Sequence, residues 1–350
     1  MRVCKSLLKS ALPLILTLCN SNTARPQEKG TASACDPEIL VGVTVRDGQL
    51  VRGLTNTSFS ATIKKRVVSV SSAAYDRSGR RIVLVVDRGS KMNDAAQTLA
   101  KTVVTRALSN SRPQDSFALI TSGPDPLRVP FGTPPAEVLV KFSANGASDH
   151  SSTKIGVLDA IAESAGWFQA PRRGDALFVF SGDDKFNDSR AKFNKTLRSL
   201  QQQGIRVFAM LFGYIRMGTY YTFWNGPLNG PGPGPPLSSN VSREEEDLNN
   251  LAYGTGGYLS VENTHDVWQR YKLNDDRTKE VERIGWQLYG GIAETYILRF
   301  ARSADEIGTV RVGLAADVIS KVPGAVVVQS RNASECEASP GKANPDPAKH

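Results

Sequence analysis

Histidine and cysteine are scarce in this chain, which has three histidines and four cysteines among its 350 residues. So few cysteines exclude a small scaffold held together by many disulfides, and three scattered histidines exclude a histidine-rich metal site. Apolar residues make up 40%, charged residues 22% and aromatic residues 7%, a mixture that is typical of globular proteins and excludes disorder throughout. The length predicts two domains, or one large domain with additions.

The chain also lacks the signatures of common enzyme classes. It contains no Gly-x-Ser-x-Gly elbow, no phosphate-binding Gly-x-x-x-x-Gly-Lys-Ser/Thr loop and no His-Glu-x-x-His motif. The net charge is +9, but the basic residues are spread singly or in short runs among acids, without an aromatic-rich basic stripe. We therefore expect a protein that is not an enzyme and does not bind nucleic acid.

Residues 1–24 have the pattern of a secretory signal peptide. Arg2, Lys5 and Lys9 precede an apolar core at 11–19, and small or polar residues follow it. This core is shorter than the roughly 20 residues that span a bilayer, and no later stretch is apolar enough, so we expect no transmembrane segment. The sequence predicts an exported protein, periplasmic or extracellular. A lipid anchor at Cys19 is an alternative that the leucine before it disfavours.

Export would place the remaining cysteines in an oxidising compartment. Cys4 and Cys19 lie in or at the edge of the signal peptide, which leaves Cys35 and Cys336. A single pair in such a compartment is most simply a disulfide, here between the two ends of the mature chain. Two unpaired cysteines near the chain ends are the alternative.

Strand and helix patterns alternate over the middle of the chain. Apolar runs typical of buried strands occur at 82–86, 117–121, 177–180, 205–212 and 258–261. Apolar residues at helical spacing follow most of these runs, at 92–107, 155–162, 193–200 and 248–252. This alternation predicts a doubly wound, mainly parallel α/β domain at 79–275.

Segments with β character flank this domain on both sides. They lie at 39–45, 59–63 and 67–71 before it, and at 295–301, 309–314 and 325–329 after it. The simplest topology inserts the α/β domain into a small β-sandwich formed by 36–78 and, after a linking helix, by 276–336. We expect 337–350 to be a disordered tail and the Pro/Gly-rich insert at 225–236 to be a surface loop.

Polar residues follow two of the predicted buried strands. The first group is Asp87 to Met92, and the second begins at Ser181. Because ligands of open parallel sheets bind beyond the carboxyl ends of the strands, both groups would line one crevice. A third loop, which contains Thr153 and directly precedes a predicted helix, would reach the same crevice. The candidate binding residues are Asp87, Ser90, Lys91, Thr153 and Asp183.

The motifs in their order along the chain resemble the von Willebrand factor type A domain over about residues 80–275. With the flanking segments, they are similar to the bacterial secreted, acidobacterial-type VWFA-related family. The loop at Asp87 carries the resemblance, together with the segments at 41–47, 51–55, 251–257 and 294–298. The resemblance implies a von Willebrand A, Rossmann-like fold and a non-catalytic protein-interaction or adhesion module with a protein partner.

The resemblance also implies a metal-ion-dependent adhesion site for Mg²⁺ or Mn²⁺, from which this sequence departs. The family's first loop reads Asp-x-Ser-x-Ser, a second loop supplies Thr and a third supplies Asp. Asp87 and Thr153 match, but Gly89 and Lys91 stand at the two serine positions, and the third loop reads Ser181-Gly182-Asp183 in place of Thr-Asp-Gly. We expect a degenerate site in which Lys91 pairs with Asp87 in place of a metal.

Two other functions stay open at this point. One is a metal-dependent hydrolase that uses a shifted site at Asp87 and Asp183. The other is a structural envelope protein in which the crevice is vestigial.

Overall fold

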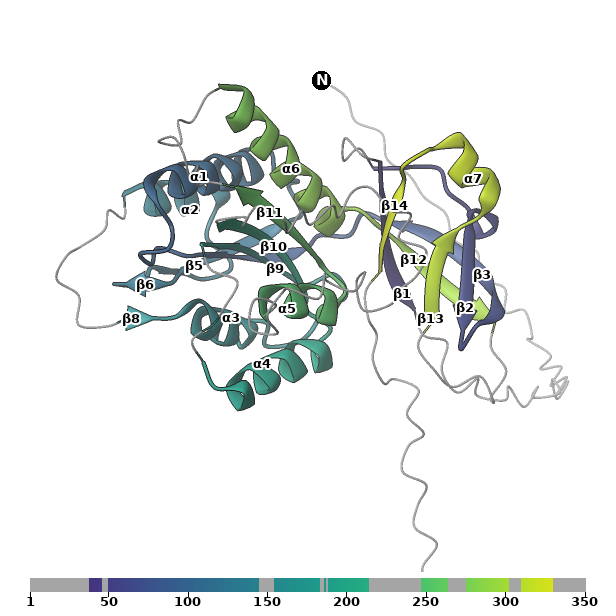
Figure 1. Cartoon of the computed structure of the whole chain (residues 1–350), viewed down its shortest axis with the longest axis horizontal. Coiled ribbons are helices and arrows are strands. Elements are labelled where there is room, and N and C mark those ends of the chain that lie inside the picture. The colour runs from purple at the N-terminus through teal and green to yellow at the C-terminus, as the bar shows by residue number, and fades with distance from the viewer. Residues whose placement is uncertain are drawn as a thin grey trace, which may run out of the picture. The chain divides into compact units, whose positions relative to one another are not determined.

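The computed structural model contains two six-stranded sheets, one mainly parallel and one antiparallel (Figure 1). It describes residues 38–45, 50–144, 154–182, 186, 188–213, 247–263, 275–301 and 310–329. No helix within these ranges is both long and apolar enough to cross a membrane. The predicted signal peptide, its lipidation site, the Cys35–Cys336 disulfide, the insert at 225–236 and the tail lie outside the described residues.

The mainly parallel sheet has the strand order β11-β10-β9-β4-β5-β7. Its strands are β4 (Arg81–Val86), β5 (Ser116–Thr121), β7 (Arg128–Val129), β9 (Ala176–Ser181), β10 (Arg206–Gly213) and β11 (Tyr258–Asn263). Neighbouring strands are parallel, except that the edge strand β7 is antiparallel to β5. Counted along the chain, this is the 3-2-1-4-5-6 order of doubly wound folds. The predicted doubly wound, mainly parallel sheet is therefore confirmed.

Helices cover both faces of this sheet (Figure 1). On one face lie α1 (Asp94–Ser109), α2 (Pro135–Ala144) and α6 (Asp275–Ala293), and on the other lie α3 (Val157–Ala165), α4 (Arg190–Gln202) and α5 (Asp247–Thr255). β4 is buried from Ile82 to Val86 because both of its faces are covered.

Two local features differ from the sequence prediction. The sequence did not predict α2, because only Val138 of this helix is buried and no apolar stripe repeats along it. Ile155 was predicted to begin a helix but lies in β8 (Lys154–Ile155), which pairs with β6 (Gly123–Pro124) as a separate two-stranded sheet. The helix α3 begins two residues later, at Val157.

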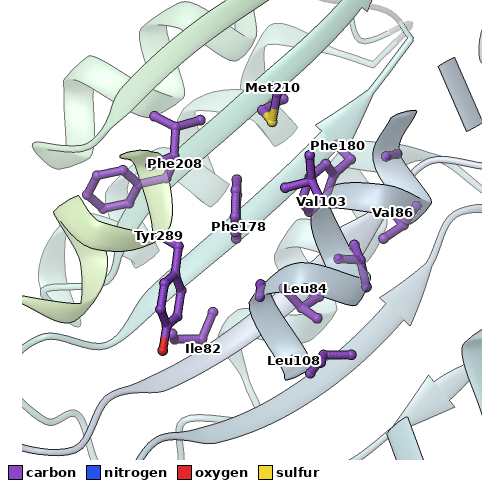
Figure 2. Packing of buried hydrophobic residues seen from close by; sticks show 14 of the residues in the cluster. Ile82, Leu84, Val86, Val103, Leu108, Phe178, Phe180, Phe208, Met210 and Tyr289 are labelled. Atoms are coloured by element: carbon purple, nitrogen blue, oxygen red, sulfur yellow. The ribbon is translucent and has the colours of Figure 1, made fainter. Parts of the chain in front are cut away.

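The core on one face of the parallel sheet is filled by α1 and α6. Figure 2 shows Tyr289 of α6 beside Ile82 of β4, and Val103 of α1 beside Phe180 of β9. The two helices approach closely at Gly285, where a Cβ atom would lie 2.2 Å from Cγ1 of Val103. A side chain at this position would therefore have to displace Val103 or separate the helices.

The antiparallel sheet has the order β13-β2-β3-β12-β1-β14. Its strands are β1 (Ile39–Thr44), β2 (Phe59–Ile63), β3 (Arg66–Asp76), β12 (Thr295–Ala301), β13 (Val310–Leu314) and β14 (Val326–Gln329), accompanied by the short helices η1 (Asn56–Ser58) and α7 (Ala316–Lys321). The sequence predicted a sandwich, whereas the structure has one continuous sheet. The reason is the eleven-residue strand β3, which pairs with β2 near its start and with β12 over the rest of its length.

The side chain of Gln329 joins the two edge strands of this sheet. Its Oε1 accepts a hydrogen bond of 2.7 Å from the Val312 amide, and its Nε2 donates one of 2.9 Å to the Val310 carbonyl. The side-chain amide therefore satisfies the edge of β13 as a peptide group of a neighbouring strand would. The sheet is nearly closed by this contact, around the core formed by its inward-facing apolar residues.

Candidate functional site

The candidate crevice lies at the carboxyl ends of β4 and β9, which are neighbours in the sheet. The chain leaves β4 toward α1 on one face and leaves β9 toward α4 on the other face. The two connections diverge, so this is the point where the strand order reverses and where open α/β sheets bind ligands. The sequence placed Asp87 and Ser181 at this edge, and the strand pairing puts them there.

Asp87 is the centre of the described part of the crevice and is only 5% exposed. Its Oδ1 accepts hydrogen bonds from the Gly89 amide at 2.8 Å and from the Ser122 hydroxyl at 2.6 Å. Its Oδ2 accepts a longer one, of 3.3 Å, from the Gly182 amide. Because these donors come from the loops after β4, β5 and β9, one carboxylate connects the ends of three neighbouring strands.

Glycine lets these loops approach each other. At Gly182 a Cβ atom would lie 2.5 Å from the carbonyl carbon of Lys91, and at Gly123 it would lie 3.0 Å from that of Arg88. Gly123 also has a φ of 90°, which residues with a Cβ rarely adopt. The first loop is therefore packed against the other two by backbone contact as well as through Asp87.

The first loop leads directly into α1. Asn93 is the N-cap of this helix, and its side chain accepts a hydrogen bond of 2.8 Å from the Ala96 amide. Such a cap satisfies one of the free amides of the first helical turn. The loop is thus held at both ends, by Asp87 on the strand side and by Asn93 on the helix side.

Two cations belong to this loop. Arg88 is half-buried, and burial lowers the pKa of its guanidinium group below the usual value. Ser90 and Lys91 are exposed. The predicted Lys91–Asp87 ion pair is not formed between these two described residues. Asp87 is instead satisfied by two amides and a hydroxyl, which reach the buried carboxylate where the exposed ammonium of Lys91 does not.

Thr153 and Asp183 lie outside the described residues. Asp87, Ser90 and Lys91 of the predicted set are described, and all three lie in the first loop. Sequence reasoning missed Ser122, which is 1% exposed and supplies the shortest hydrogen bond to Asp87. The signal for it was present, because Ser122 directly follows the buried strand β5 as Asp87 follows β4.

Of the predicted metal ligands the structure describes Asp87 alone, because Thr153 and Asp183 lie outside the described residues. Hard cations such as Mg²⁺ or Ca²⁺ require about six or more oxygen ligands, whereas Gly89 has no side chain and Lys91 brings a positive charge. Oδ1 of Asp87 already accepts two hydrogen bonds. Among the described parts of the chain, no group of three or more His, Cys, Asp or Glu side chains is placed to hold a metal.

Known proteins resemble this chain in fold alone. No family model and no curated protein matches the chain. Among solved structures, the chain is similar to the conserved hypothetical protein BatB from Bacteroides thetaiotaomicron, with 16% identity over 60% of this chain and 98% of that one and a TM-score of 0.39. The SpRpn10 VWA domain matches with 9% identity over 53% of this chain and 88% of that one, at a TM-score of 0.34.

Proximal thread matrix protein 1 from the mussel byssus also matches, with 12% identity over 66% of this chain and 50% of that one and a TM-score of 0.39. At these identities and scores none of the three indicates a function. The strand order defines the class: a doubly wound α/β domain with a nearly closed antiparallel sheet. Three loops, connected by one buried carboxylate, meet at its switch point.

Proposed function

We propose that this chain is an exported, non-catalytic protein-interaction module, which binds an acidic segment of a partner at the Asp87 crevice without a divalent metal. The hydrogen bonding of Asp87 carries this proposal. The carboxylate that would be the first metal ligand of an adhesion site instead accepts hydrogen bonds from three protein donors. It acts as an internal connection that keeps the crevice formed when no ligand is bound.

The cations of the first loop support an acidic partner. Lys91 is exposed, Arg88 is half-buried, and neither forms an ion pair with any residue that the structure describes. A guanidinium group that is already partly desolvated gains more from a carboxylate than a fully hydrated one, because the bidentate, charge-assisted hydrogen bonds form in a weaker dielectric. A carboxylate of the partner would then contact the protein directly, where a metal would bridge the two in an adhesion site.

The burial of Ser122 supports a non-catalytic role. Its hydroxyl donates to a carboxylate, an arrangement that activates nucleophiles in some enzymes. At 1% exposure, however, this hydroxyl is out of reach of a substrate. The contact therefore serves the fold of the crevice.

The test begins by capturing partners of the full chain from an envelope extract and then titrates the identified partner against purified variants. We expect Lys91→Glu to weaken binding at least about tenfold through charge repulsion. Lys101→Glu is the matched control, because Lys101 is an exposed lysine on α1 that lies outside the crevice. An excess of chelator should leave the affinity unchanged.

Three results would contradict the proposal. If chelator abolishes binding, the crevice depends on a metal. If Lys91→Glu and Lys101→Glu bind equally, the partner contacts another surface. A hydrolytic activity that is lost both on chelation and in Asp87→Ala would favour the metal-dependent hydrolase instead.

A further inference from the structure

The hairpin between β2 and β3 turns through two lysines in a conformation that lysine rarely adopts. Ile63 pairs with Arg66, so the loop consists of Lys64 and Lys65 alone. Their φ angles are 48° and 71°. Two-residue turns with two positive φ angles strongly favour Asn-Gly, because a Cβ atom crowds the backbone there. Lysine at both positions is therefore a poor choice for stability and calls for another explanation.

Positive charge is concentrated at this end of the antiparallel sheet. Lys64, Lys65 and Arg66 are all exposed, and so is Arg311 of β13, whose neighbour across the sheet is Thr62 of β2. None of these four cations forms an ion pair with another described residue. The acid within β2, β3 and β13 is Asp76, at the opposite end of β3.

An exposed apolar side chain lies among these cations. Val67 is 82% exposed, the largest value among the large apolar residues that stand out as exposed in the structure. Thr62 pairs with both Arg311 and Val67, so the three form one row across the sheet. Their neighbours Ile63, Val68 and Val310 are buried, which places this row on the outward face.

We propose that this surface, the basic hairpin end (Lys64, Lys65, Arg66, Val67 and Arg311), docks on anionic lipid headgroups. A tight turn presents several cations without forming a pocket, which suits a flat, multiply charged surface better than a single acidic side chain. Each lysine near an anionic membrane strengthens binding by roughly a factor of five. Val67 adds apolar area that can enter the headgroup region. The inference is independent of the Asp87 crevice.

The experiment measures co-sedimentation of the mature chain, residues 25–350, with vesicles of phosphatidylcholine, with and without phosphatidylglycerol. Omitting residues 1–24 removes Cys19 and the cations and apolar core of the predicted signal peptide, which would themselves bind anionic vesicles. The decisive variant is Lys64→Asn/Lys65→Gly, which supplies the residues that the turn favours. We expect it to be at least as stable as the parent protein, yet to bind anionic vesicles about 25-fold more weakly.

A matched control removes the same charge elsewhere. Lys101→Gln/Lys279→Gln changes two exposed lysines on α1 and α6 that form no ion pair with a described residue, and it should bind anionic vesicles as the parent protein does.

A separate variant tests the apolar contribution. Val67→Gln should bind anionic vesicles more weakly than the parent protein, and this difference should persist at high salt, where the charge contribution is screened.

Several outcomes would overturn the proposal. The parent protein could fail to bind anionic vesicles at low salt, or the turn variant and the matched control could bind equally. If heparin binds the hairpin end more tightly than vesicles do and Val67→Gln affects neither, the surface takes an anionic polysaccharide and not a lipid.

Discussion

The hydroxyl of Ser122 donates a hydrogen bond of 2.6 Å to the buried carboxylate of Asp87 and so connects the ends of β5 and β4. The same carboxylate receives the Gly182 amide, which follows β9. The crevice at the switch point is therefore assembled by side-chain and backbone donors of the protein itself.

Removing the hydroxyl of Ser122 should destabilise the fold. Hydrogen bonds to charged groups contribute about 1.5 to 3 kcal/mol, and Ser122→Ala should lower the free energy of unfolding by about that amount in urea titrations. Ser90→Ala changes an exposed serine of the neighbouring loop and should stay within about 0.5 kcal/mol of the parent protein. Equal stability of the two variants would show that the contact with Asp87 contributes little.

Divalent metal should neither bind tightly nor stabilise the protein. A ligand that binds the folded state raises the midpoint of unfolding, so Mg²⁺, Mn²⁺ and excess chelator should leave the thermal midpoint unchanged. Calorimetric titration of either ion should give no heat of tight binding. Tight binding that Asp87→Ala abolishes would contradict this prediction.

The contact between α1 and α6 should respond to substitution at Gly285 in a compensating way. Gly285→Ala alone should destabilise by about 1 to 3 kcal/mol, because its Cβ atom would lie 2.2 Å from Cγ1 of Val103. The clash thus outweighs the stabilisation of about 1 kcal/mol that alanine provides over glycine in a helix interior. In Val103→Ala/Gly285→Ala the added methyl group occupies the vacated space, so the double variant should be more stable than the sum of the single effects predicts. Additive effects in the double-mutant cycle would argue against direct contact.

Acid should remove a stabilising contribution of Glu294. Burial raises the pKa of this carboxyl, but the hydrogen bonds from Tyr75 and Arg52 outweigh it and hold the pKa below the usual 4.5. A depressed carboxyl pKa stabilises the fold above the unfolded value of 4.5, and this contribution is lost as the pH falls through the folded value.

The difference in unfolding free energy between the parent protein and Glu294→Gln should therefore be constant near neutral pH and shrink below pH 4.5. The side chain of Arg52 is 61% exposed, so the contribution of its ion pair with Glu294 to stability should also fall with added salt. A difference that does not change between neutral and acid pH would show that the carboxylate form is not the stabilising one.

The near closure of the antiparallel sheet should depend on Gln329. Gln329→Ala removes both bonds to β13 and leaves the Val312 amide and the Val310 carbonyl without them, which should cost about 1 to 3 kcal/mol. The local readout is hydrogen exchange of the Val312 amide, which should accelerate strongly in the variant. Unchanged exchange at Val312 would show that the strands stay joined without this side chain.

The strands of the parallel sheet were predictable because each is marked by a run of consecutive apolar residues. The run from Ile82 to Val86 is continuously apolar, and the helix after it carries apolar residues at helical spacing. The short elements β7 and β8 were not predictable, because two residues carry no periodicity and are defined by their partners. The single antiparallel sheet depends likewise on β3 choosing partners far along the chain.

Of the candidate site, the sequence alone predicts which residues stand at the ends of buried strands, since a strand end is visible as the point where an apolar run stops. It does not say which donor meets Asp87. Ser122 and Gly182 are separated from it by 35 and 95 positions, and only the order β9-β4-β5 brings them within hydrogen-bonding distance. The same tertiary arrangement decided that Lys91 stays exposed, because amides and a hydroxyl satisfy a buried carboxylate at shorter range than a long, hydrated ammonium.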